Sequence, residues 1–82
     1  MQVARGTIVV AQEQRFQLEL ASGGRRLFLL APTAGLLDRD LKRLAAAQTE
    51  VEVHYRPLEG LIAASAEKVL ALAPGSMEGS VE

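Results

Sequence analysis

Apolar and polar residues alternate along the first part of the chain with the period of a β-strand. A half-buried strand repeats every two residues, because successive side chains point to opposite faces. Residues 3–11 and 15–21 follow this period, and the glycines of Ser22-Gly23-Gly24 predict a tight turn before a third strand at 25–31. We therefore predict an antiparallel meander of three strands. Gly6, Ile8 and Val10 share one face of the first strand, and Phe16, Leu18 and Leu20 form the interior face of the second.

The third segment, RRLFLL, is apolar on both faces, so its buried face depends on the length of the preceding turn. A two- or four-residue loop places Leu27 and Leu29 inside and turns Arg26, Phe28 and Leu30 outward. A three- or five-residue loop reverses every side chain of the strand. Because two-residue glycine turns are the more common hairpin connection, we predict that Phe28 points outward.

After Pro32 the period changes to that of an amphipathic helix. Residues 34–47 carry an apolar stripe of Leu37, Leu41 and Leu44, and Thr33 is a candidate N-cap. Asp38 and Lys42 stand four residues apart, which favours an ion pair on one helix face.

Alternation returns in the last third of the chain. Residues 51–56 place Val51, Val53 and Tyr55 on one face of a fourth strand. Residues 61–72 are expected to form a fifth strand, although their alanines are also compatible with a helix. Residues 1–72 are therefore predicted to form one domain, and 73–82 a flexible C-terminal tail rich in Gly and Ser.

The order strand-strand-strand-helix-strand-strand resembles the OB-fold, a small Greek-key barrel with its helix between the third and fourth strands. The resemblance covers residues 3–72 and rests on the segments GTIVV, RFQLEL, RRLFLL, LLDRDLKRL and VEVHYR. It is a likeness of pattern and topology, without a diagnostic motif. It implies a mainly β protein with one helix and a five-stranded antiparallel barrel. An SH3-like barrel is the alternative, and a meander with two helices follows if 61–72 are helical.

Composition narrows the class of protein. The chain has 82 residues, of which 49% are hydrophobic, enough for one packed domain. The absence of cysteine excludes disulfides and thiolate chemistry, and a net charge of −1 argues against strong non-specific binding of nucleic acid. No apolar run approaches the roughly 20 residues of a membrane span, and the N-terminal run is short for a secretory signal. We expect a cytoplasmic protein with no membrane partner.

No arrangement of residues predicts catalysis or a cofactor. The single histidine, His54, has no nucleophile or orienting acid near it in sequence, and the glycines do not form a phosphate-binding loop. Glu50, Glu52 and His54 share one strand face, but a metal needs ligands that converge from several elements. We expect a solvated polar face, no metal and no enzyme.

The OB-fold resemblance implies that ligands bind on the outer face of the second and third strands. The candidate ligand-binding residues are Arg15, Arg25, Arg26, Phe28 and Leu30. One hypothesis is a stacking platform at Phe28, flanked by arginines, for short single-stranded nucleic acid or a similar anionic planar ligand. The other is a protein-interaction module, in which the same apolar face binds a partner protein or forms a weak homo-oligomer.

Overall fold

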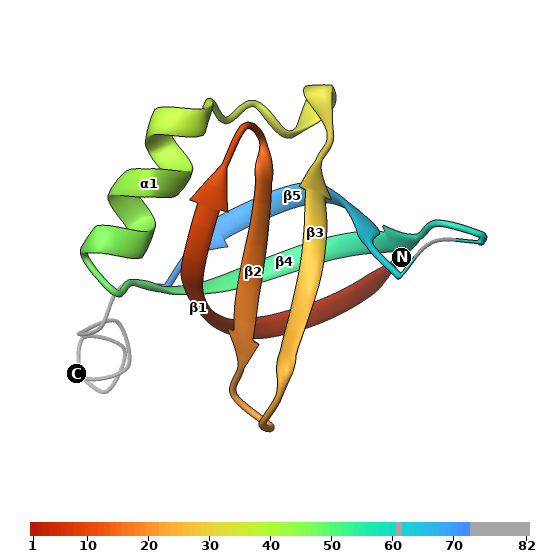
Figure 1. The fold of residues 1–82 in the computed structure, drawn as a ribbon, viewed down its shortest axis with the longest axis horizontal. Helices are drawn as coiled ribbons and strands as arrows, with labels where there is room; N and C mark the ends of the chain where they lie inside the picture. The colour runs from red at the N-terminus through yellow and green to blue at the C-terminus, as the bar shows by residue number, and fades with distance from the viewer. Residues whose placement is uncertain (61, 73–82) are drawn as a thin grey trace, which may run out of the picture.

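The computed structural model describes residues 1–60 and 62–72 as a small β-barrel with one α-helix (Figure 1). The mainly β composition and the position of the helix are confirmed. The segment 64–71 is a strand, so the two-helix alternative is wrong. Leu61 and the predicted tail 73–82 lie outside the described residues. The elements are β1 (Gln2–Gln12), β2 (Arg15–Leu20), β3 (Arg25–Leu30), the 3₁₀ helix η1 (Pro32–Ala34), α1 (Asp38–Ala46), β4 (Glu50–Pro57) and β5 (Ala64–Ala71).

The barrel closes because the long strand β1 pairs with two neighbours. Its first part pairs with β4 and its second part with β2, and Gly6 lies in both ladders, opposite Leu20 and Val51. A Cβ on Gly6 would overlap the carbonyl oxygen of Glu19, so only glycine permits this close approach of two backbones. The bulge of β1 lies further along, between Ile8 and Val10.

The strand order around the barrel is β1-β2-β3-β5-β4. Neighbours are antiparallel except β3 and β5, which run parallel through Phe28–Leu30 and Ala64–Ala66. The prediction of a wholly antiparallel barrel is therefore wrong at this one pair. Five strands cannot alternate direction around a closed ring, so one neighbouring pair must be parallel. The closed five-stranded arrangement is consistent with an OB-like fold.

The β2–β3 hairpin has the register that reverses the predicted faces of β3. Gly23 N–H donates to the Leu20 carbonyl and Leu20 N–H to the Gly24 carbonyl, each at 2.9 Å. This is a three-residue loop whose last residue, Gly23, has a φ of 105°. Phe16 therefore lies opposite Phe28.

The prediction that Phe28 and Leu30 point outward is accordingly wrong. Phe28 is fully buried and Leu30 is 7% exposed. Leu27 and Leu29, predicted to be inside, alternate with them and lie on the outer side, where they are half-buried. The predicted inward residues of β2 are correct: Phe16 and Leu18 are buried, and Leu20 packs against the core.

The helix covers one end of the barrel and begins later than predicted. Gly35 has a φ of 78° and Leu37 is extended, so the helix begins at Asp38 rather than at Ala34. The Leu37 N–H donates to the Asp40 carboxylate at 2.8 Å, which replaces the expected cap at Thr33. The core cluster joins the helix to all five strands. It contains Ile8, Phe16, Leu18, Phe28, Leu30, Leu41, Val51, Val53, Tyr55, Ala64, Ala66 and Val69.

Candidate ligand groove at the start of strand β3

The five sequence-predicted site residues do not form one surface. Arg15 and Arg25 are exposed on the outer face of the β2–β3 hairpin, where Arg15 pairs with Glu13 at 3.4 Å and Arg25 lies opposite Glu19. Arg26, Phe28 and Leu30 alternate on the inner face. Figure 1 shows the hairpin with its turn remote from the chain that leads into α1.

The predicted stacking platform does not exist in this structure. The chain has three aromatic residues, and all are buried: Phe16 is 1% exposed, Phe28 0% and Tyr55 7%. Phe28 stacks on Phe16 at a centroid distance of 5.3 Å and meets Tyr55 edge-on at 5.2 Å. The aromatic rings therefore serve the core, and a ligand on the outer face would meet aliphatic and polar side chains instead.

Arg26 closes this aromatic cluster at the start of β3. Its guanidinium carbon lies 4.7 Å from the centroid of the Tyr55 ring and 6.0 Å from that of Phe28. A cation–π contact of this kind contributes about 0.5–2 kcal/mol, more as the pair is desolvated. The Arg26 Nε is buried and has no hydrogen-bond partner among the described residues. The side chain is thus held in place by rings and retains donor capacity.

Arg26 also lines a groove of about 610 Å³ between the β2–β3 hairpin and the loop that joins β4 to β5. Two arginines, one amide and three aliphatic side chains meet there. Ile62, on the loop side, is 90% exposed. We call this site the arginine groove. Its lining residues are Gln17, Leu20, Arg25, Arg26, Leu27 and Ile62.

The two arginines of the groove, Arg25 and Arg26, were predicted from sequence as ligand-binding residues. The other four lining residues were not. Leu27 was assigned to the interior with the wrong hairpin register. Ile62 was assigned to a strand, whereas the structure places it in the connection before β5. An apolar residue just after the turn at Pro57-Leu58-Glu59-Gly60 is the signal that could have marked it as a contact residue. The stacking of Arg26 on Tyr55 depends on register and has no sequence signal.

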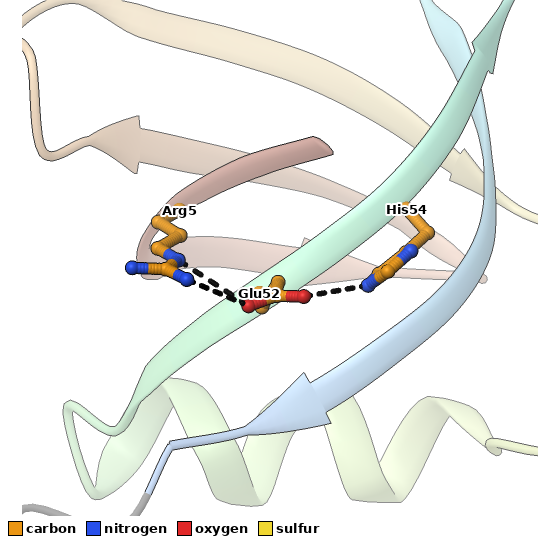
Figure 2. Close-up of polar contacts among 3 residues, drawn as sticks. All are labelled: Arg5, Glu52 and His54. Carbon is orange, nitrogen blue, oxygen red and sulfur yellow. Dashed lines mark hydrogen bonds and ion pairs between the residues drawn. The ribbon is translucent and has the colours of Figure 1, made fainter. Parts of the chain in front are cut away.

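A second polar cluster lies on the outer face of β1 and β4 (Figure 2). Glu52 accepts a hydrogen bond from His54 Nε2 at 2.7 Å and pairs with Arg5 Nη2 at 3.2 Å. The hydrogen bond from His54 and the charge of Arg5 hold the pKa of Glu52 below its ordinary value, while desolvation of the carboxylate opposes them. Each side chain is therefore already partnered, and the cluster stabilises the ladder between β1 and β4.

The row of Glu50, Glu52 and His54 was expected to be a solvated polar face. Within residues 1–60 and 62–72, no three His, Asp or Glu side chains gather closely enough to hold a metal ion. The described part of the chain also has no helix with the length and apolar character needed to cross a membrane.

Comparisons with protein-family models, with curated proteins and with solved structures found no match for this chain.

Proposed function

We propose that this protein is a small binding module without catalytic activity, and that it binds an acidic segment of a partner protein in the arginine groove. The observation that carries the proposal is Arg26, whose guanidinium is stacked on Tyr55 and whose side chain lines an open groove. Charge-assisted hydrogen bonds between arginine and carboxylate are among the strongest that proteins form. A carboxylate is therefore the group that best complements this position.

The rest of the groove supports a peptide ligand. Leu20, Leu27 and Ile62 offer aliphatic contacts, and Gln17 offers both a donor and an acceptor. Arg25 adds a second cation, although Glu19 stands opposite it on β2. A mixed site of this kind suits a segment that carries both apolar and acidic side chains.

Short single-stranded nucleic acid is the second candidate ligand. It is favoured by the place of the groove beside the β2–β3 face of an OB-like barrel and by the two arginines. It is disfavoured because single-strand binders stack bases on exposed aromatic side chains. All three aromatic residues of this chain are buried. An acidic peptide therefore fits the groove better than an oligonucleotide.

Fluorescence anisotropy at low salt tests the proposal. The probes are a labelled peptide of alternating valine and glutamate and a labelled short oligothymidylate. We expect the wild-type protein to bind the peptide more tightly than the oligonucleotide. Arg26→Gln and Arg25→Gln should each weaken the peptide complex about tenfold, the equivalent of about 1.4 kcal/mol for a lost charged hydrogen bond.

Arg39→Gln is the matched control, because Arg39 is exposed on α1 and lies outside the groove. It changes the net charge by the same amount and should leave peptide affinity unchanged. Preferential binding of the oligonucleotide would favour the second candidate. Absence of peptide binding, or equal weakening by all three variants, would contradict the proposal.

A further inference from the structure

We infer that the acidic segment binds as an added β-strand along the free edge of β3, an inference that rests on the proposed function of the arginine groove. The free edge exists because β5 pairs with β3 only from Phe28 to Leu30. No strand among the described residues lies opposite Arg25, Arg26 and Leu27 on that side. Figure 1 shows β5 meeting β3 only near the arrowhead of β3.

The direction of the backbone groups follows from the hydrogen bonds at the two ends of β3. Leu30 N–H donates to the Gln14 carbonyl at 2.7 Å, toward the hairpin partner, and the next residue, Ala31, donates to the Ala66 carbonyl at 2.9 Å, toward β5. Backbone groups alternate sides along a strand, so Arg25 and Leu27 point theirs away from β2. Within residues 1–60 and 62–72, the N–H of Leu27 and the N–H and C=O of Arg25 therefore form an unpaired strand edge.

This edge and the arginine groove are the same place. Arg25 and Leu27 supply the free backbone groups, and together with Arg26 they supply half of the side chains that line the groove. A peptide that enters the groove in an extended conformation can pair with the backbone of β3. Side chains from its two faces would then lie against Arg25 and Arg26, which project from opposite faces of β3. Strand addition of this kind derives affinity from main-chain hydrogen bonds and specificity from the flanking side chains.

The positive charge of the β3 edge determines which kind of strand can pair with it. In a two-fold antiparallel pairing of this edge with a second copy of the chain, Arg25 and Arg26 would lie close to the same two arginines of the other copy. Like charges directly opposite across a sheet are destabilising, and charged edges deter pairing between copies. A strand with acidic side chains would instead be attracted to Arg25 and Arg26. The edge is therefore suited to a partner of opposite charge rather than to self-association.

Backbone N-methylation of the valine–glutamate peptide tests this binding mode. Every second peptide N–H faces the edge in strand addition, so methylation of the valine nitrogens and methylation of the glutamate nitrogens should differ in effect. We expect one methylated peptide to bind at least about tenfold more weakly than the unmodified peptide, because methylation removes the N–H groups that donate to the edge of β3. The other methylated peptide should retain its affinity.

The outcomes separate the two proposals. If the unmodified peptide binds and the two methylated peptides have equal affinities, retained or lost, strand addition is overturned while the proposed function stands. If the unmodified peptide does not bind at all, the proposed function itself fails, and the inference fails with it.

Discussion

Phe16 and Phe28 face each other across the β2–β3 ladder with their ring centroids 5.3 Å apart and their planes inclined by 23°. Tyr55, from β4, meets the second ring edge-on at 5.2 Å. Offset and edge-on aromatic pairs add about 0.5–1.5 kcal/mol each beyond the area that they bury. These three rings connect the hairpin to the opposite wall of the barrel, so they form the centre of the core.

Phe28→Ala should lower the free energy of unfolding by about 3–5 kcal/mol, as expected for truncation of a buried phenylalanine. Urea denaturation followed by circular dichroism measures the change. Leu29→Ala is the matched control, because Leu29 is the next residue and is only half-buried on the outer face. It should cause a clearly smaller loss. Equal losses for the two variants would mean that the hairpin register described above is incorrect.

The register of the β2–β3 hairpin could not be predicted from the sequence. In RRLFLL, one face carries Arg26, Phe28 and Leu30, and the other carries Arg25, Leu27 and Leu29. Each face has one arginine followed by two apolar residues, so alternation gives no preference. The turn at Gly23 and Gly24 accepts a two- or a three-residue loop, and only tertiary packing decides between them. The arginine groove was missed for the same reason.

The strands and their order were predictable because β1, β2 and β4 each have one buried face, which leaves a period of two in the sequence. The i,i+4 pair between Asp38 and Lys42 was also predictable and is present at 3.1 Å. The start of the helix at Asp38 could not be predicted, because the apolar spacing of the helix continues through η1 and Gly35. Parallel pairing of β3 with β5 is a property of closing five strands and has no local signal.

The β1–β2 turn offers a simple way to stabilise the protein. Glu13 and Gln14 have φ values of 52° and 66°, a region that L-residues with side chains adopt at a cost. Two consecutive residues of this kind form the turn that Asn-Gly favours. Glu13→Asn/Gln14→Gly should raise stability by about 1 kcal/mol and increase Tm, because the main-chain contacts of Gln14 with Leu30 and Asp38 remain available.

Thermal unfolding by circular dichroism checks this prediction. The control is Gln17→Gly, which places glycine within β2 and should lower Tm. A double variant that melts at or below the wild-type temperature would contradict the assigned turn geometry.

The Glu52 cluster should make stability depend on pH in the acidic range. The pKa of Glu52 is lower in the folded protein than its ordinary value, because of the hydrogen bond from His54 and the charge of Arg5. A carboxyl group with a lowered folded-state pKa stabilises the protein above its unfolded pKa, and this contribution disappears as the pH falls through the folded value. Unfolding free energy should therefore fall on acidification below about pH 4.

Urea denaturation at neutral and acidic pH, for wild type and Glu52→Gln, measures this contribution. The variant should be less stable at neutral pH and should lose less stability on acidification. Glu59→Gln, at an exposed glutamate of the β4–β5 loop, is the control and should behave like wild type. The same acid dependence in wild type and Glu52→Gln would show that the cluster does not carry the effect.

Ligand binding in the arginine groove, at the start of β3, is the property on which the proposed function depends. Titration of the ¹⁵N-labelled protein with the valine–glutamate peptide, followed by amide chemical shifts, tests it most directly. We expect the largest shifts at Arg25, Arg26, Leu27, Gln17 and Ile62, with the amides of Glu52 and His54 unchanged. Shifts centred on the Glu52 face or on α1, with the amides of β3 unmoved, would contradict it.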